Sequence, residues 1–368
     1  MSTPRIRAVR IWKYSVPMEP FTISLGTIDS AHNILVQILL DDGTDGWGEG
    51  SPFPMLVGET QETAYVLARN FARLWIGRNP LETEALMAEL NRYIAHHPTL
   101  KSAFDMALFD IRGKLSGQPL YRLLGGTNRT MLTDETIGLA STDEMVRKAL
   151  VLKGKGAPAI KVKLGTTARE DIHRIAQIRA AIGSEIPLRV DANQGWDIQS
   201  ALAVLKGIAP FYVEYCEEPV PRWNNAGLKV VRDNSPIPIM ADESVFDHHD
   251  AHRVTALGAC DYINIKLAKS GGLLVADKVN AIAEAAGIRC MMGSMCESRL
   301  GLTASAHFAA ARENIFYCDL DMVFTMKADP VIGGMEFRGH EIHLPDTPGI
   351  GASVDPEFLR NMPMQEII

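Results

Sequence analysis

From about residue 126 onward, short apolar runs alternate with amphipathic stretches. A short apolar run predicts a buried strand, and apolar positions three to four residues apart predict a helix. Eight such runs each end in a polar or charged residue: Thr136, Lys163, Asp191, Glu217, Asp242, Lys266, Ser294 and Asp319. These residues are 24 to 28 positions apart, about the length of one strand, one helix and two short loops. The repeat therefore predicts a parallel (β/α)₈-type barrel.

A doubly wound α/β sheet is the alternative fold for alternating strands and helices. That fold commonly carries a glycine-rich, phosphate-binding turn after an early strand. Neither a GxGxxG motif nor a P-loop motif occurs in the sequence. The barrel is therefore the favoured prediction.

Residues 1–125 follow a different order, with strands first and helices afterwards. Residues 5–16 and 33–40 are apolar runs that predict strands, and the Asp- and Gly-rich segment 41–46 predicts a hairpin turn. Helical periodicity covers three further stretches, 62–77, 82–97 and 100–117. This order predicts a small α+β domain.

The last forty residues break the barrel repeat. Gly333 and Gly334 precede a predicted hairpin at 335–345, and a loop-rich tail follows. We expect this segment to return to the first domain, because the ends of composite domains tend to lie together. The predicted fold is a modified TIM (β/α)-barrel at 126–325 with an α+β capping domain at 1–125, completed by the C-terminal segment 326–368.

Composition excludes several classes of function. The 368 residues carry a net charge of −7 without a block of Lys or Arg, which argues against a nucleic-acid partner. The N-terminus lacks the apolar stretch of a signal peptide, and no apolar run is long enough to span a bilayer. The five cysteines form no CxxC pair, so we expect buried free thiols. We expect a cytoplasmic homo-oligomer that acts on a small molecule.

Three acids at the ends of neighbouring strands predict a metal site. In a barrel, the active site lies at the carboxyl ends of the strands. Asp191, Glu217 and Asp242 end the third, fourth and fifth predicted strands, so their carboxylates should converge. Close anions repel one another unless a cation compensates them. Because all three ligands are oxygens, we expect Mg²⁺, with Mn²⁺ as the alternative.

Two lysines should flank that cation. Lys163 and Lys266 end the second and sixth strands, which are four apart in a ring of eight and therefore on opposite sides of the mouth. A nearby cation, a second ammonium and burial would each lower the pKa of a lysine and favour its neutral, basic form. One lysine would remove a proton from a carbon and the other would deliver a proton to the opposite face, which inverts the configuration. The metal would stabilise the enolate that develops.

Single strand-end acids and lysines are usually solvated or form salt bridges. The combination of three acids and two lysines on five consecutive strands favours catalysis instead. Lys161 lies on the same face as Lys163 and is a candidate for substrate binding. Lys269 is expected to lie past the strand end, as a less important residue.

The same residues resemble those of the enolase superfamily, in particular its muconate-lactonizing group. The motifs that carry the resemblance, which extends over essentially the whole chain, are KVK (161–163), DANQGW (191–196), EEP (217–219), ADES (241–244) and NIKLAKSGG (264–272). The superfamily uses a Lys or His base with Mg²⁺. The resemblance implies the same ligands and bases, namely Asp191, Glu217 and Asp242 with Lys163 and Lys266.

The run Asp319-Leu320-Asp321 resembles the DxD motif of dipeptide epimerases, where two carboxylates hold the free α-ammonium of the substrate. Alternate strand residues share a face, so both acids could point at one cation. A solvated acidic loop or a contact to an arginine is the alternative. The resemblance also implies that Thr136 and Ser294 contact the substrate, Ser294 through its backbone amide.

Mobile N-terminal loops are expected to select the substrate side chain, at 19–26 and 51–60. An epimerase acting on Ala-Glu should carry a cation in the first loop, but this loop offers Phe21, Ile23 and Leu25. We therefore expect a dipeptide with a hydrophobic or small C-terminal residue. Arg299 or a residue on another loop could supply the missing charge, which keeps an L-Ala-D/L-Glu epimerase as an alternative.

Other reactions remain open at this point. A cycloisomerase, an o-succinylbenzoate synthase and an N-acylamino acid racemase belong to the same superfamily, but their substrates lack a free ammonium. A lyase that forms a Schiff base through Lys163 or Lys266 is a further alternative, because barrel aldolases use lysine in this way. The last alternative is a non-catalytic binding protein that keeps the barrel fold.

Overall fold

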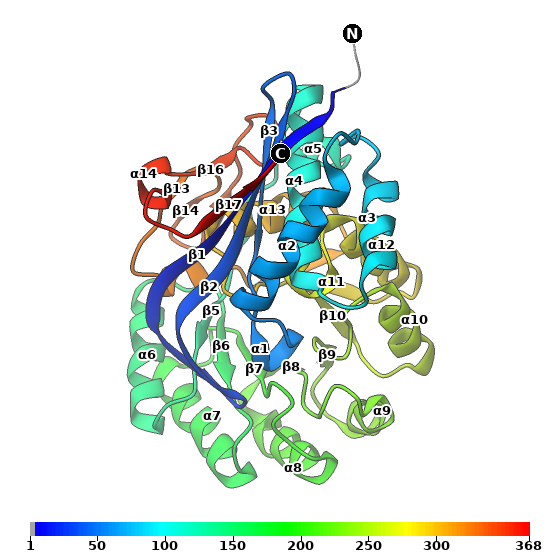
Figure 1. The fold of residues 1–368 in the computed structure, drawn as a ribbon. Helices are drawn as coiled ribbons and strands as arrows, with labels where there is room; N and C mark the ends of the chain where they lie inside the picture. Colours follow the sequence, from blue (N-terminus) through cyan, green and yellow to red (C-terminus); the bar gives the residue numbers. More distant parts are fainter. Residues whose placement is uncertain (1–3) are drawn as a thin grey trace.

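The computed structural model describes residues 4–368 and contains the eight-stranded parallel sheet that the repeat predicts (Figure 1). Its strands neighbour one another in chain order from β5 to β12. Their bounds are β5 (Glu135–Ile137), β6 (Ile160–Lys163), β7 (Leu188–Asp191), β8 (Val213–Glu217), β9 (Ile239–Ala241), β10 (Tyr262–Ile265), β11 (Arg289–Met292) and β12 (Ile315–Cys318). A parallel bridge between Thr133 and Cys318 joins the two edges. The barrel prediction is confirmed.

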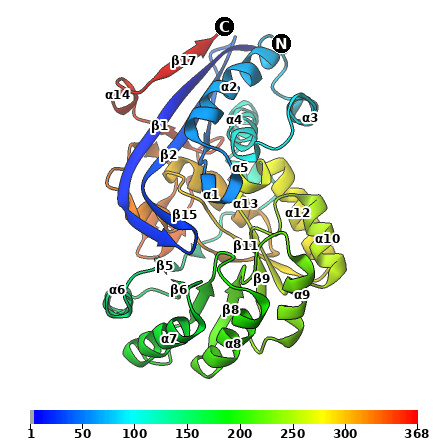
Figure 2. The ribbon, with the colours of Figure 1, turned by 60° about the horizontal axis from the view of Figure 1, so that its bottom comes forward.

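Helices surround this sheet and cover its outer face (Figure 2). They are α6 (Thr142–Gly154), α7 (Ala168–Ile182), α8 (Ile198–Ile208), α9 (Asn225–Asn234), α10 (His248–Leu257), α12 (Leu273–Ala285) and α13 (Arg299–Ala311), with the short α11 (Leu267–Ser270) and the 3₁₀ turns η1 (Ala209–Phe211) and η2 (Met322–Thr325). The strands are apolar because helices cover one face and the barrel interior buries the other. Within residues 4–368, no helix is long and apolar enough to cross a membrane.

The eight predicted strand-end residues lie at or near the carboxyl ends of their strands. Three are the last residues of their strands, namely Lys163, Asp191 and Glu217, and three follow their strands directly, namely Asp242, Lys266 and Asp319. Ser294 lies two residues beyond β11, and Thr136 lies inside β5. Sequence spacing therefore locates the barrel mouth to within two residues.

The N-terminal part is an antiparallel sheet covered by helices, as predicted. Its strands are β1 (Ile6–Ile23), β2 (Gly26–Leu40) and β3 (Asp45–Gly50), and its helices are α1 (Pro54–Val57), α2 (Gln61–Trp75), α3 (Thr83–Tyr93), α4 (Pro98–Ser116) and α5 (Leu120–Leu123). The turn between Leu40 and Asp45 confirms the predicted hairpin. Buried apolar side chains of β1, β2, α2, α3 and α4 form a core separate from that of the barrel.

The loop expected at 19–26 is the tip of a long hairpin. Strands β1 and β2 remain paired up to Ile23 and Gly26, so the segment expected as a loop over the barrel mouth is the paired end of a hairpin. Cross-strand pairing satisfies the backbone groups there, although the run is interrupted by prolines that disfavour a strand assignment. The tip rests on the barrel, where Leu139 N donates to Thr22 O at 2.8 Å and Ser24 Oγ donates to Asn193 O at 2.7 Å.

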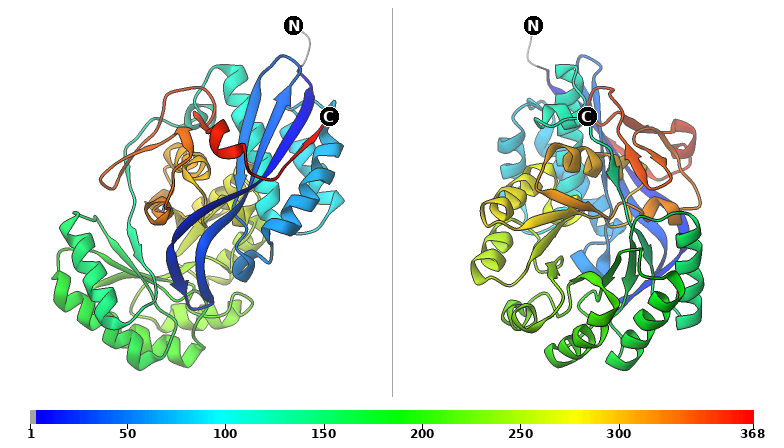
Figure 3. Two further views of the ribbon diagram at one scale, coloured as in Figure 1. Left: turned by 60° about the vertical axis from the view of Figure 1, so that its left-hand side comes forward. Right: turned by 180° about the vertical axis from the view of Figure 1, so that it is seen from behind.

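The C-terminal segment contacts both parts of the molecule. Strand β17 (Met364–Ile367) pairs with β1 in an antiparallel register, and Figure 3 shows the red C-terminal end beside the blue first strand. The predicted hairpin is present as β14 (Glu336–Arg338) and β15 (Glu341–His343), and it pairs with β4 (Met131–Leu132) before the barrel. The remaining elements are β13 (Val331–Gly333), β16 (Ala352–Val354) and α14 (Pro356–Leu359). We keep residues 125 and 325 as proposed domain boundaries.

Strand β3 packs so closely on α4 that a side chain at Gly48 would overlap the carbonyl oxygen of Ala103. We expect Gly48→Ala to lower the free energy of unfolding by about 1–3 kcal/mol or more, because the strand must move away from the helix backbone. Urea denaturation measures this change. Gly154→Ala is the control, since a Cβ there meets open space on a helix and should be neutral or slightly stabilising. Equal losses in both variants would contradict the close-packing argument.

Candidate active site

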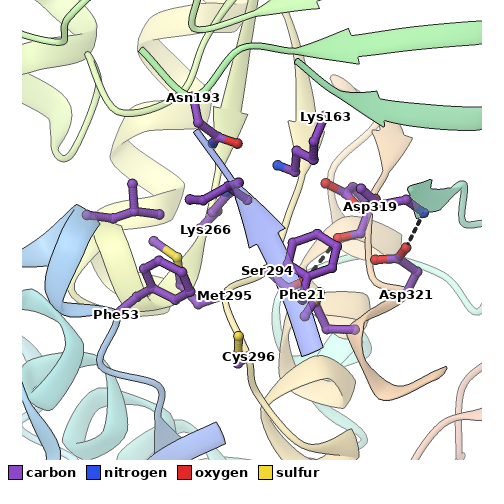
Figure 4. Close-up of a pocket in the computed structure, with 14 residues that line it drawn as sticks. Phe21, Phe53, Lys163, Asn193, Lys266, Ser294, Met295, Cys296, Asp319 and Asp321 are labelled. Atoms are coloured by element: carbon purple, nitrogen blue, oxygen red, sulfur yellow. Dashed lines mark hydrogen bonds between the residues drawn. The ribbon is translucent and has the colours of Figure 1, made fainter. Parts of the chain in front are cut away.

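A pocket lies at the mouth of the barrel beneath the hairpin tip (Figure 4). The capping domain supplies aromatic and aliphatic residues of its wall, and the barrel supplies its polar floor together with Met295, Cys296 and Met322. The lining residues are Phe21, Ile23, Phe53, Leu56, Thr136, Lys163, Asn193, Lys266, Ser294, Met295, Cys296, Asp319, Asp321 and Met322. Its charged lining residues are two lysines and two aspartates.

The three predicted metal ligands are side by side below this pocket. Asp191, Glu217 and Asp242 are fully buried and come from the adjacent strands β7, β8 and β9. Burial, followed by the charge of Asp191, raises the pKa of Glu217 to about 8. The structure therefore brings together the three acids that the sequence singled out.

Ammonium groups surround these acids. Among residues 4–368, no group of three or more His, Cys, Asp or Glu side chains is spaced to hold one metal ion. Lys161 Nζ instead lies 2.6 Å from Glu217 Oε2 and 3.5 Å from Asp191 Oδ2. Glu217 Oε2 and Asp242 Oδ2 are both buried, and each lies against an ammonium group, Lys161 Nζ at 2.6 Å and Lys266 Nζ at 2.7 Å respectively. Three buried carboxylates from adjacent strands are a donor set that fits a hard divalent cation.

The two predicted bases line the pocket from different sides. Lys163 ends β6 and Lys266 follows β10, with three strands between them, and Figure 4 shows the two side chains apart across the pocket. Lys163 Nζ lies 2.6 Å from Asp191 Oδ2, and Lys266 Nζ lies 2.7 Å from Asp242 Oδ2. Burial acts to lower the pKa of Lys266, but the carboxylates of Asp242 and Glu217 together outweigh it and the pKa is raised. The lowered pKa that the sequence predicts for a lysine beside a bound cation stays a prediction.

Lys161 and Lys269 are more deeply involved than the sequence suggested. Both are buried, and Lys161 Nζ also contacts Asp319 Oδ2 at 2.7 Å. Lys269 lies past the strand end, as expected, but its ammonium donates to Asp242 Oδ1 at 2.6 Å and to Asn264 O at 2.9 Å. The available signal for Lys269 was its place three residues after Lys266, in the short helix α11 that begins directly after that lysine.

The two acids of the DLD run lie in a loop, not on a strand. Strand β12 ends at Cys318, so the argument from alternating strand positions was wrong. Both acids still line the pocket. Asp321 Oδ1 is buried without a hydrogen-bond partner, and burial together with the charge of Asp319 raises the pKa of Asp321. An acceptor in this state attracts a cationic ligand group.

Thr136 and Ser294 contact these acids. Thr136 N donates to Asp321 Oδ2 at 2.6 Å and Thr136 Oγ1 contacts Asp319 Oδ1 at 3.4 Å. Ser294 Oγ donates to Asp319 O at 3.1 Å. Both residues line the pocket, where the sequence predicted substrate contacts.

The apolar wall agrees only partly with the expected specificity loops. Phe21 and Ile23 line the pocket, whereas Leu25 is outside it and 39% exposed. Arg299, suggested as a source of positive charge, is outside the pocket: it contacts Asp329 Oδ2 at 2.7 Å and backbone carbonyls of the C-terminal segment. That contact depends on a segment far away in sequence, so no local pattern signals it.

Sequence reasoning also missed Asn193, Met295, Cys296 and Met322 as lining residues. The capping domain holds the loop that carries two of them. Asn33 Nδ2 donates to Cys296 O at 2.8 Å and Cys296 N donates to Ser51 Oγ at 3.0 Å. Glu49, a buried acid of β3, accepts from Ser298 N at 2.9 Å. The pocket is thus shared between the two parts of the chain.

Comparisons with known proteins agree with this arrangement. Residues 6–125 match the family described as mandelate racemase / muconate lactonizing enzyme, N-terminal domain, and residues 144–358 match the family described as enolase C-terminal domain-like. The chain is also 40% identical over 337 residues to the hydrophobic dipeptide epimerase of Enterococcus faecalis. The aligned region covers 91% of this chain and 95% of that protein. The chain belongs to the dipeptide epimerase family of the enolase superfamily. The predicted family, including its muconate-lactonizing group, is confirmed.

Other members of the dipeptide epimerase family are equally similar. The L-Ala-D/L-Glu epimerase of Clostridium acetobutylicum is 39% identical over 350 residues, covering 94% of this chain and 98% of that protein. The crystal structure of the Cytophaga hutchinsonii dipeptide epimerase, complexed with Mg and the dipeptide D-Ala-L-Val, superimposes with a TM-score of 0.98 at 37% identity. The superposition covers 99% of this chain and 100% of the Cytophaga hutchinsonii chain. The capped barrel is therefore the fold of this family.

We expect Lys161→Met to destabilise the protein by about 3–5 kcal/mol in the presence of EDTA. The change leaves buried carboxylates of Asp191, Glu217 and Asp319 without their shared ammonium, and an unpaired buried charge costs that much. Lys155→Met is the control, because its exposed ammonium lies 3.7 Å from Glu135 and should contribute less than about 1 kcal/mol. Similar urea midpoints for both variants would show that Lys161 does not compensate the acids.

Proposed function

We propose that this chain is a Mg²⁺-dependent dipeptide epimerase, an isomerase that inverts the α-carbon of the C-terminal residue of a dipeptide. One observation carries the proposal: two lysines from β6 and β10 line the same pocket as a pair of buried aspartates. Lysines at separate sides of a pocket can reach opposite faces of one carbon. The aspartates supply a site for a cationic end of the substrate.

Asp319 and Asp321 are proposed to bind the α-ammonium of the dipeptide. Asp321 has an unpaired buried oxygen, and a charge-assisted hydrogen bond from an ammonium would satisfy it. Thr136 and Ser294 fix the two acids from β5 and from the loop after β11. Binding of the ammonium at the DLD run would thereby fix the position of the α-carbon that reacts.

Lys163 and Lys266 are proposed to be the two bases. The lysine on the side of the α-hydrogen, in its neutral form, accepts that proton. The ammonium of the opposite lysine then donates a proton to the other face, so that the two lysines exchange protonation states and the carbon is inverted. Holding both amines beside the carbon removes the need for solvent to supply either proton.

Asp191, Glu217 and Asp242 are proposed to hold the Mg²⁺. When bound, the ion would supply positive charge next to the substrate carboxylate and so stabilise the negative charge that proton removal places there. Lys161, buried among these acids and Asp319, is proposed to add a fixed positive charge and to assist substrate binding. Mn²⁺ is the alternative ion, because the same oxygen ligands suit it.

The side chain of the reacting residue is proposed to be hydrophobic or small. The pocket wall contains Phe21, Phe53, Leu56 and Met295, and burying an apolar side chain against them contributes about 25 cal/mol per Å². An L-Ala-D/L-Glu epimerase is the second candidate, since one relative at 39% identity carries that name. It is less favoured, because the lining cations are the two proposed bases and a glutamate side chain would have to compete for them.

The other superfamily reactions are less favoured for a specific reason. Substrates of cycloisomerases, o-succinylbenzoate synthases and N-acylamino acid racemases have no free ammonium to pair with Asp321. A lyase using a Schiff base would need no divalent ion, so loss of activity in EDTA separates it from the proposed epimerase. Trapping of a substrate adduct by borohydride would support the lyase instead.

The proposed function is tested by incubating the protein with Mg²⁺ and pooled dipeptides in D₂O. Epimerised dipeptides gain one deuterium at the α-carbon, which mass spectrometry detects. Hydrophobic and small C-terminal residues should gain deuterium faster than glutamate. The proposal fails if no dipeptide gains deuterium, and EDTA should abolish the gain.

We expect Lys163→Ala and Lys266→Ala each to lower the epimerisation rate by at least about 10³-fold, because each removes one of two proton-transfer groups. Either variant should still exchange the α-hydrogen of one stereoisomer with D₂O, and the two variants should act on opposite isomers. Chiral analysis of deuterium incorporation measures this. Lys155→Ala, an exposed lysine, is the control. Exchange of the same isomer by both variants would refute the assignment to opposite faces.

Asp321→Asn should raise KM for dipeptides by about 10- to 100-fold with a smaller change in kcat. The substitution keeps the shape of the side chain and removes the charge that pairs with the ammonium, which is worth about 1.4–2.8 kcal/mol at those ratios. Steady-state kinetics with several dipeptides measures the effect. A KM equal to that of the wild type for all of them would argue against ammonium binding by this residue.

A further inference from the structure

The two edges of the barrel meet at a seam that also carries the DLD run. We define the seam as residues 133–136 of the β5 edge and residues 318–321 of the β12 edge. Its successive bonds run from Asp134 N to Cys318 O at 3.2 Å, from Thr136 Oγ1 to Asp319 Oδ1 at 3.4 Å, from Leu320 N to Thr133 Oγ1 at 2.9 Å and from Thr136 N to Asp321 Oδ2 at 2.6 Å. Every residue of 318–321 is therefore tied to the opposite edge.

Within the seam, Leu320 N is the backbone group between the two acids. Burial and then the charge of Asp319 raise the pKa of Asp321, whereas Lys161 Nζ lies 2.7 Å from Asp319 Oδ2. Two like charges this close in sequence favour a loop conformation that separates them. A fixed backbone between them opposes that separation. The bond from Leu320 N to Thr133 Oγ1 supplies this restraint.

Thr133 is itself held on both sides. Its hydroxyl donates to Asp134 O at 3.0 Å while it accepts from Leu320 N, and its backbone N donates to His340 O at 3.0 Å. The residue is fully buried and does not line the pocket. The hydroxyl therefore cannot turn to another partner without leaving Leu320 N unsatisfied, which is costly in a buried site.

We propose that Thr133 is a positioning residue for substrate binding: its hydroxyl fixes Leu320 and thereby holds Asp319 and Asp321 at the spacing that captures the α-ammonium of a dipeptide. The inference rests on the proposed function of the DLD run. It adds that the contact closing the barrel also sets the geometry of the ammonium site. Thr133 touches neither substrate nor the reacting atoms.

Thr133→Val tests this role, because valine keeps the shape of threonine and removes the hydroxyl. We expect KM for dipeptides to rise about tenfold, equivalent to about 1.4 kcal/mol, with kcat changed less than threefold. Thr133→Ser keeps the hydroxyl and should restore the wild-type KM. A wild-type KM in Thr133→Val, or an equally raised KM in Thr133→Ser, would overturn the proposal.

A merely structural role is separated by a second readout. Inhibition by a non-reactive dipeptide analogue is compared with inhibition by its N-acetylated form, which has no ammonium. Thr133→Val should weaken the first about tenfold and leave the second unchanged. Equal weakening of both would show a general loss of packing and overturn the proposal.

Arg129→Met is the matched control for stability. Its guanidinium joins the same barrel edge to Ala309 O at 2.7 Å and Ile315 O at 3.0 Å, away from the pocket. It should lower the thermal midpoint at least as much as Thr133→Val without changing KM. A raised KM in this variant would mean that any weakening of the barrel edge disturbs binding.

Failure of the Thr133 role can be distinguished from failure of the proposed function. If the wild type epimerises no dipeptide, the function of the whole site is wrong. If the wild type is active and Asp321→Asn binds poorly while Thr133→Val binds normally, only the role of Thr133 is wrong. Should Thr133→Val not fold, Thr133→Ala removes the same hydroxyl without a branched side chain and is judged by the same criteria.

Discussion

Compensation of buried charge at the barrel mouth is the constraint on which the site depends. Three fully buried carboxylates on adjacent strands cannot coexist without positive charge, and the chain places the ammonium groups of Lys161, Lys163, Lys266 and Lys269 among them. These ion pairs orient the lysines and the acids together. The proposed catalytic groups are therefore positioned by the same interactions that make their burial tolerable.

The pocket above these charges is a joint product of two cores. The barrel contributes polar residues at strand ends, whereas the capping domain contributes aromatic and aliphatic side chains and fixes the loop around Cys296 through Asn33 and Ser51. The proposed catalytic groups therefore lie on the barrel, whereas most of the proposed specificity residues lie on the capping domain.

The sequence by itself determined the barrel, its register along the chain and most of the charged floor. A strand, a helix and two loops need a nearly constant number of residues, so the period locates each strand end. Because parallel strands present their carboxyl ends at one mouth, the acids at 191, 217 and 242 and the lysines at 163 and 266 could be brought together from spacing alone. These inferences depend only on the length of each strand–helix repeat and on the symmetric arrangement of the strands in the barrel.

Only the tertiary structure decided the features that depend on contacts between distant segments. The contact of the hairpin tip with the barrel from Ser24 to Asn193, the engagement of Arg299 by the C-terminal segment and the seam from Thr133 to Leu320 each join residues far apart in sequence. The loop position of Asp321 likewise follows from where β12 ends. Hydrogen bonds and ion pairs of this kind leave no periodic signal, because any polar residue can form them once the fold has set the distance.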